Sequence, residues 1–162
     1  MIDLGHRRIA LVGGYTLLDV VSSERAAGFT SVLAAAGVTL ADAYVRDGDF
    51  TIVGGHRAMR ALLALPEPPT AVFFMSDEMA FGAIRAIRES GLRLGHDVSV
   101  VGFDDHTVSE SMGLTTVRQP VRDIGRVGAR LMLDILDGEH AAGHHPMELA
   151  LVERISTGHP AT

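Results

Sequence analysis

The feature that most constrains the fold is a regular alternation between short apolar runs and longer amphipathic stretches. Three compact runs, at 9–12, 72–74 and 98–101, are rich in β-branched or aromatic residues and apolar almost throughout. Such runs are typical of strands buried on both faces of a parallel sheet. A weaker strand is expected at 43–46.

Helical stretches fill the spaces between these strands. Apolar residues recur at helical spacing in 23–36, 52–65 and 77–90, and the first and third stretches stop at Gly37 and Gly91. A strand-helix-strand order requires parallel pairing through right-handed crossovers. The sequence therefore predicts an α/β fold, with an open parallel sheet and helices on both of its faces.

The regular alternation of strands and helices changes after Gly102. A polar loop at 104–113 leads to a short strand at 114–117, then to a helix at 120–137. A His-rich loop and a last strand at 148–154 follow. This second part adds one long helix and two strands to the predicted sheet.

The long helix carries an apolar stripe that needs a partner surface. Val121, Ile124, Leu131 and Ile135 follow helical spacing. Leaving them in water would forfeit roughly 1.5 to 3 kcal/mol for each side chain, a sum comparable to the whole stability of a domain. We therefore expect the helix either to fold back on its own lobe or to pack against a second copy of the chain.

Composition narrows the function classes. The 162 residues have a formal net charge of −6, and all 14 basic residues are arginine, without a basic run. Such a chain is a poor candidate for gripping nucleic acid through phosphate contacts. It has no cysteine, which excludes a disulfide framework and a thiolate nucleophile. We expect no targeting leader and no membrane span.

The loops that follow the strands are the candidate binding site, because open α/β sheets bind ligands beyond the carboxyl ends of their strands. These loops offer acids, a small hydroxyl and one aromatic ring. Arg25, expected on the first turn of the first helix, can face the same edge. The loop residues are Gly13, Gly14, Asp47 to Phe50, Ser76, Asp77 and Asp104 to His106.

This set favours a neutral polyhydroxyl ligand, such as a sugar or a nucleoside. Carboxylates accept hydrogen bonds from neighbouring hydroxyls, arginine donates in a fixed fork, and Phe50 offers a flat apolar face. Neither glycine-rich phosphate-binding motif is present, and carboxylates would repel phosphate.

Each candidate also has a purely structural interpretation. Ser76 and Asp77 fit the role of helix N-cap, which we favour for Asp77. Arg25 fits a solvated helix face, and Phe50 fits the core. The Asp104-Asp105 pair fits a turn as well as a catalytic carboxylate pair.

Catalysis and metal binding find little support. The chain has no G-x-S-x-G motif, no H-E-x-x-H motif and no lysine for a Schiff base, so we expect no enzymatic activity. His140, His144 and His145 fall in one loop, which we interpret as solvated rather than as a metal site. No cofactor is predicted.

Six segments together resemble the lactose/galactose repressor (LacI/GalR) family of bacterial transcription regulators. The pairing of VGFDD at 101–105 with LTTVRQP at 114–120 is characteristic of repressors rather than of periplasmic sugar-binding proteins. The matching segments cover nearly the whole chain: Leu4–Gly14, Arg25–Phe29, Gly48–Phe50, Ser76–Ala83, Asp97–Asp105 and Leu114–Pro120.

The resemblance implies an effector-binding module of the type 1 periplasmic-binding-protein fold, in which two lobes close on a small ligand. Arg25, Phe50, Ser76, Asp104 and Gln119 fall where the family contacts effector. Arg and Asp would bond hydroxyls, Phe would stack, and Gln119 would lie at a crossover between lobes. The family often has Asn where Ser76 stands, so the identity of the ligand does not carry over.

The resemblance also implies a domain division. Residues 1–118 would form a nearly complete C-terminal lobe, 119–152 would belong to an N-terminal lobe represented here by one helix and one strand, and 153–162 would return to the C-terminal lobe. DNA would be bound only by an N-terminal helix-turn-helix absent from this chain.

The family further implies a cytoplasmic homodimer that uses the helix after Ser76 and the strand leading to Asp104. The residues also allow two other function classes. One is the sugar-binding protein of a transporter, and the other is a small α/β enzyme acting on a polyol or sugar at the Asp104-Asp105 edge.

Overall fold

The computed structural model describes residues 1–14, 20–139 and 143–161. Within these residues one sheet has the strand order β2-β1-β3-β4-β5-β6. β1 to β5 pair in parallel, and β6 pairs antiparallel with β5. The strands are β1 (Ile9–Gly13), β2 (Val45–Asp47), β3 (Ala71–Phe74), β4 (Ser99–Asp104), β5 (Thr115–Arg118) and β6 (Ala150–Val152).

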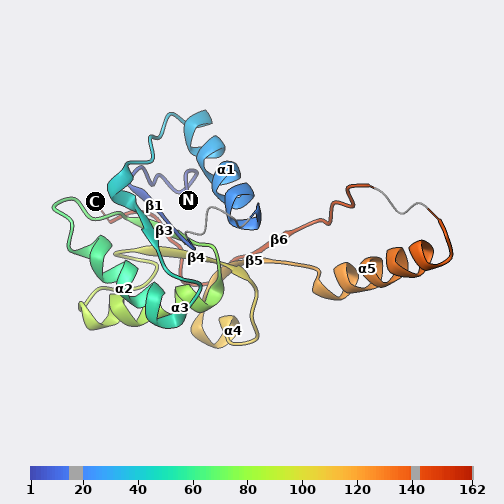
Figure 1. Cartoon of the computed structure of the whole chain (residues 1–162). Helices are drawn as coiled ribbons and strands as arrows, with labels where there is room; N and C mark the ends of the chain where they lie inside the picture. Colours follow the sequence, from blue (N-terminus) through green and yellow to red (C-terminus); the bar gives the residue numbers. More distant parts are fainter. Residues whose placement is uncertain (15–19, 140–142, 162) are drawn as a thin grey trace.

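Helices cover both faces of the sheet, as predicted. Figure 1 shows α1 (Val20–Ala35) on one face, and α2 (Ile52–Leu63) with α3 (Asp77–Glu89) on the other. The apolar runs predicted as strands become β1, β3 and β4, whose residues are mostly buried. The main core lies between these strands and the α2–α3 layer.

Two glycines let α2 and α3 pack with their backbones in contact. A Cβ atom added at Gly55 would lie 2.0 Å from the carbonyl oxygen of Met79, and one added at Gly82 would lie 1.9 Å from that of Ile52. Both helices begin at side-chain caps, because Thr51 accepts from the Gly54 amide and Ser76 accepts from the Met79 amide.

The second half of the chain holds two features that the sequence did not predict. The loop expected at 104–113 contains a short helix, α4 (Ser109–Met112). The last strand is shorter than the predicted 148–154, and its antiparallel direction makes the sheet mixed rather than wholly parallel. β6 runs antiparallel because the chain goes out along β5 and returns beside it.

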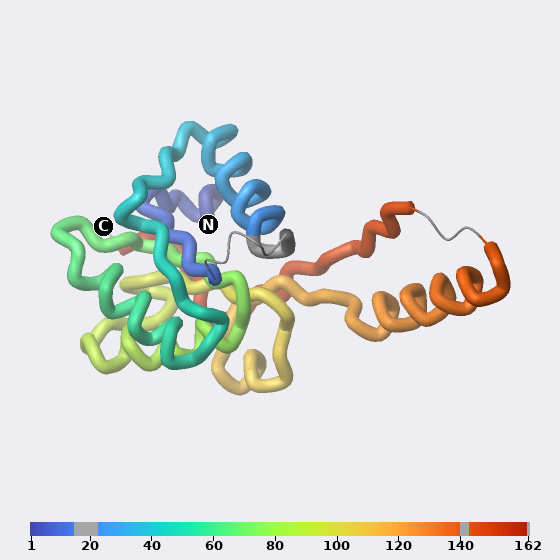
Figure 2. Tube along the Cα trace, viewed as in Figure 1, coloured from blue at the N-terminus to red at the C-terminus, as the bar shows by residue number. Residues whose placement is uncertain are grey.

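The long helix α5 (Val121–Leu136) reaches away from the sheet, as Figures 1 and 2 show. We call residues 119–149 the arm. None of the residues of α5 is buried. The expectation that this helix folds back on its own lobe is therefore wrong, because the arm continues outward beyond the carboxyl end of β5.

The C-terminal segment packs back against the lobe. The Ser156 hydroxyl donates to the carbonyl of Val100 (2.7 Å) and accepts from the Thr115 amide. The buried His6 ring bonds the hydroxyl of Thr70 and the carbonyl of Gly158, each at 2.9 Å, so both ends of the chain are tied together. In the described part of the chain, no helix combines the length and apolar character that crossing a membrane requires.

Candidate functional site

Two of the predicted site residues contact each other at the carboxyl edge of the sheet. Asp104 ends β4, and Gln119 follows β5. The Gln119 amide donates to the Asp104 carboxylate at 2.6 Å. The backbone of Asp104 has φ 121°, and that of Asp105 has φ 55°. Two successive non-glycine residues at positive φ store strain that surrounding contacts must hold, a condition that clusters at functional sites.

Arg25 projects from the second turn of α1, rather than from the first turn as expected, because the helix already begins at Val20. Its guanidinium donates to the carbonyl of Met75 (2.9 Å) and lies 3.9 Å from the centre of the Phe103 ring. These contacts hold the cation near Asp104, whose ionisation it influences. The solvated-helix interpretation of Arg25 is therefore wrong.

Phe50 follows β2 in a strained turn, with φ 49°. Its ring lies against Gly14, where an added Cβ would come within 2.4 Å of a ring carbon. The ring is only partly buried against the core. A side chain at position 14 would push the Phe50 ring from its present place.

Ser76 is the N-cap of α3 and is buried, and its hydroxyl accepts from the Met79 amide at 3.4 Å. It lies next to Met75, whose carbonyl holds Arg25. The structure thus brings Asp104, Gln119 and Arg25 together, with Ser76 adjacent in the chain to their anchor. Phe50 stands on a separate loop, after β2, where its ring lies against Gly14.

Burial is the main cause that raises the pKa of Asp104 above its ordinary value. The hydrogen bond from Gln119 and the positive charge of Arg25 act in the opposite direction, while Asp77 and Glu78 add to the increase. A ligand hydroxyl that donates to Asp104 would favour the carboxylate. Asp104 can therefore serve as the acceptor for a ligand hydroxyl at this edge.

Asp77 is a buried structural acceptor, not the helix cap that we favoured. Its carboxylate accepts from the Ser109 hydroxyl (2.6 Å), the His106 amide (2.8 Å) and the Thr116 hydroxyl. An added Cβ at Gly102 would collide with it. This carboxylate joins α3 to β5 and to the loop after β4.

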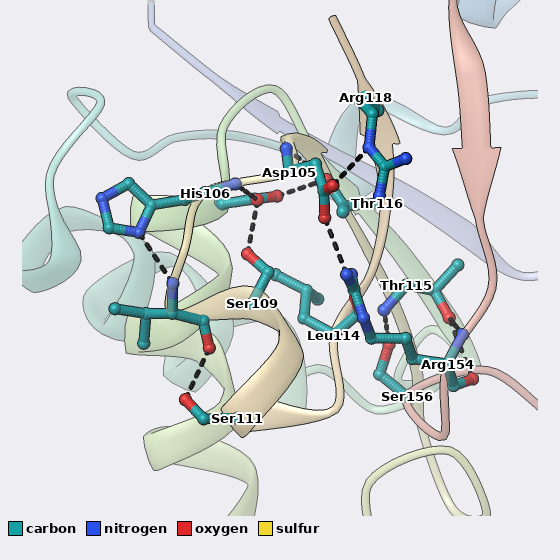
Figure 3. Close-up of polar contacts among 12 residues, drawn as sticks. Asp105, His106, Ser109, Ser111, Leu114, Thr115, Thr116, Arg118, Arg154 and Ser156 are labelled. Carbon is teal, nitrogen blue, oxygen red and sulfur yellow. Dashed lines mark hydrogen bonds and ion pairs between the residues drawn. The ribbon is translucent and has the colours of Figure 1, made fainter.

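Asp105 binds two arginines (Figure 3). The Arg118 Nε donates to one carboxylate oxygen at 2.6 Å, and Arg154 donates to the other at 2.8 Å. Burial raises the pKa of Asp105, but these hydrogen bonds and charges outweigh it, so the pKa is lowered overall. The sequence left a turn or a catalytic pair open for Asp104 and Asp105, and in the structure Asp105 is the acceptor that joins Arg118 and Arg154.

An apolar groove of about 950 Å³ lies between α1 and the sheet, and the sequence did not predict it. Among the described helices, α1 covers this face, and the groove runs beside it over apolar side chains of the sheet. The lining includes Phe29, Val32, Phe73, Phe103, Val117 and Leu149.

The expectation on metal binding involves the loop at 139–146. His140 lies outside the described residues, and His144 and His145 are exposed. Among the residues that the structure describes, no group of three His, Cys, Asp or Glu side chains could hold a metal ion.

Comparison with known proteins gives consistent matches. The model of the periplasmic binding protein-like domain matches residues 1–157. The HTH-type transcriptional repressor CytR of Escherichia coli (strain K12) is 37% identical over 158 residues, which is 96% of this chain and 46% of the repressor. The chain thus spans about half the length of the curated relatives that it matches.

Solved structures agree with the sequence comparison. A dimeric Lac repressor with an 11-residue C-terminal deletion is similar with a TM-score of 0.91 and 35% identity, over 99% of this chain and 58% of that one. A complex of the transcriptional regulator CelR with cellobiose is similar with a TM-score of 0.85 and 41% identity, over 96% of this chain and 48% of that one.

Proposed function

This chain belongs to the periplasmic binding protein-like domain family, among the LacI/GalR regulators, and on that premise we propose that it is the ligand-sensing module of a bacterial transcription regulator. The resemblance inferred from the sequence is confirmed. The observation that carries the proposal is the contact between Asp104 and Gln119, which lie at the edge where sheets of this kind bind ligands.

We propose that the effector is sugar-like or nucleoside-like. Asp104 and Arg25 would bond its hydroxyls, Phe50 would stack on its apolar face, and Ser76 and Gln119 would complete the polar contacts. The match to a CelR–cellobiose complex supports a carbohydrate. The transporter protein and the enzyme acting on a polyol are not favoured, because the relatives are transcription regulators.

For the whole protein, we propose that effector binding modulates the DNA affinity of a helix-turn-helix outside this chain. CytR is named an HTH-type repressor, which supports the assignment of effector binding and DNA binding to separate domains. The sequence division gives 119–152 to the other lobe, but β6 pairs with β5 in this sheet. We therefore propose that residues 1–118 and 150–162 form one lobe and that 119–149 belong to the other. We place the protein in the cytoplasm, as a regulator without enzymatic activity.

We further propose a homodimer. The matched Lac repressor is described as dimeric, and its structure superposes with a TM-score of 0.91. The exposed apolar residues of α5 supply a surface that a second copy can cover. Val121, Ile124 and Ile135 are among them.

A nuclear magnetic resonance titration of the labelled chain tests the effector site. Millimolar cellobiose and adenosine are added separately, because one lobe alone buries less of a ligand than the 70 to 90% that tight sites bury. We expect one of them to shift the signals of Arg25, Phe50, Ser76 and Gln119. Asp104→Asn should weaken binding, while Asp97→Asn, which changes a partly buried acid that pairs with Arg93, should not.

Unshifted signals with both compounds would contradict the proposal, as would equal binding by the Asp104→Asn variant. The same spectra test the enzyme alternative. Product signals from cellobiose that vanish in Asp104→Asn would favour an enzyme over a sensor.

A further inference from the structure

The arm is joined to the lobe by two neighbouring strands, and Asp105 holds a residue from each of them. Arg118 belongs to the outgoing strand β5, and Arg154 follows the returning strand β6. Arg118 pairs with Ala150 in the sheet, at the base of the arm. The Asp105 carboxylate therefore bridges the strand that leads into the arm and the segment that leaves it, as Figure 3 shows.

The carboxylate stands on a fixed backbone. The Asp105 amide donates to the hydroxyl of Thr116 (3.3 Å), which itself donates to the buried Asp77. The following amide, of His106, donates to the same Asp77 at 2.8 Å. These bonds hold the backbone of Asp105 at its positive φ of 55°, so the carboxylate projects from a fixed point of the lobe.

The two arginines differ in freedom. The Arg154 side chain is 16% exposed and also donates to the carbonyl of Leu114 at 2.7 Å. Two acceptors, Asp105 and this carbonyl, therefore hold it in place. The Arg118 side chain is 55% exposed, and Asp105 is the acceptor that its Nε reaches. Arg118 is therefore the partner whose place depends most on the charge of Asp105.

The two adjacent acids at the end of β4 accept hydrogen bonds from two adjacent residues at the end of β5. Asp104 accepts from Gln119, and Asp105 accepts from Arg118. We propose that Asp105 is a positioning residue that fixes the direction of the arm relative to the lobe and thereby keeps Gln119 beside Asp104. The role for the effector rests on the proposed function, whereas the control of arm direction does not.

Distance measurements between spin labels test the arm without any ligand. The chain contains no cysteine, so Arg88→Cys on α3 and Ala129→Cys on α5 give two exposed label sites on lobe and arm. Labelled chain is diluted with unlabelled chain so that only distances within one molecule contribute. We expect one narrow distance distribution, and a broad or shifted one after Asp105→Asn.

Arg118→Gln is the second variant, since it changes an exposed side chain and decides the matter even if Asp105→Asn fails to fold. It should broaden the distribution, and combining it with Asp105→Asn should add little. The control is Asp123→Asn, which removes an ion pair within α5 and should leave the distribution unchanged.

An unchanged distribution in Arg118→Gln and in folded Asp105→Asn overturns the proposal. A broadening of equal size in Asp123→Asn also overturns it. These results are independent of the titrations with cellobiose and adenosine. A chain that binds neither compound but loses its arm direction in Asp105→Asn would refute the proposed function and keep the positioning role.

Discussion

At the scale of residues, Asp104, which ends β4, and Asp105, which follows it, have opposite environments although they are adjacent in sequence. Burial raises the pKa of Asp104, whereas the bonds from Arg154 and Arg118 overcome burial and lower that of Asp105. The positive φ values at both residues turn the side chains to different partners. The sequence indicated an acidic edge, but the division of roles depends on backbone strain that no pattern of residue types reveals.

The raised pKa of Asp104 predicts a pH-dependent affinity for a hydroxyl-bearing effector. A donated hydrogen bond favours the carboxylate, so binding should strengthen as pH rises through this pKa and stay constant above it. Asp104→Asn should remove that dependence and weaken binding by about tenfold, the loss of one hydrogen bond to a charged group. Titrations with cellobiose from pH 4 to 7.5 measure this. A parallel pH dependence in the variant would contradict it.

The buried Asp77 predicts a large stability loss on truncation. Asp77→Ala leaves the Ser109 hydroxyl, the His106 amide and the Thr116 hydroxyl without their acceptor, at a cost of about 3 to 5 kcal/mol. Urea denaturation measures the change. Glu78→Ala is the matched control, since this exposed neighbour should cost less than about 1 kcal/mol. Equal losses in both variants would contradict the role of Asp77.

At the scale of elements, the sequence predicted what local periodicity controls. Helices α1, α2 and α3 and strands β1, β3 and β4 appear near their expected positions, because continuous apolar runs and helical stripes are local signals. The last strand was predicted, but its antiparallel direction and the short α4 were not. β6 owes its direction to pairing with β5, and α4 is held at Ser109 by Asp77, both contacts between residues distant in sequence.

The α2–α3 contact predicts opposite effects of the same substitution on two helices. Gly82→Ala places a methyl group against the backbone of Ile52 and should destabilise the chain by about 2 kcal/mol or more. Gly28→Ala, in α1, meets no atom within 4 Å and should stabilise by up to about 1 kcal/mol. Thermal denaturation followed by circular dichroism compares them. Equal midpoint shifts would show that the backbones do not pack as described.

At the scale of the whole molecule, the candidate site shows the limit of a single sequence. Strand-end reasoning placed Asp104 and Arg25 at one edge, and the resemblance added Gln119, which the structure joins to Asp104. The partners that fix them escaped prediction, since the Met75 carbonyl is a backbone group and Phe103 belongs to a core strand. Only the folded structure shows which groups hold Arg25 in place.

The exposed stripe of α5 predicts self-association of the chain. Val121, Ile124 and Ile135 remain open, and covering each would contribute about 1.5 to 3 kcal/mol. Changing Ile124 and Ile135 together to Glu should weaken the dimer at least tenfold, a difference of 1.4 kcal/mol, without loss of helix content. Sedimentation equilibrium measures the constant.

The control for this prediction is Arg126→Gln, on the same helix, which should leave the dimer constant unchanged. Strictly monomeric unmodified chain in light scattering at high concentration would contradict the expectation.

The return of β6 beside β5 also makes the arm a detachable insertion. Arg118 and Ala150 already face each other in an antiparallel ladder, the geometry that a two-residue hairpin turn closes. Replacing residues 119–149 by Asn-Gly should therefore leave Arg118 and Arg154 on Asp105 and the core intact. The lobe can be regarded as a six-stranded unit that carries the arm in place of one hairpin turn, so the arm could be exchanged for another segment without redesigning the sheet.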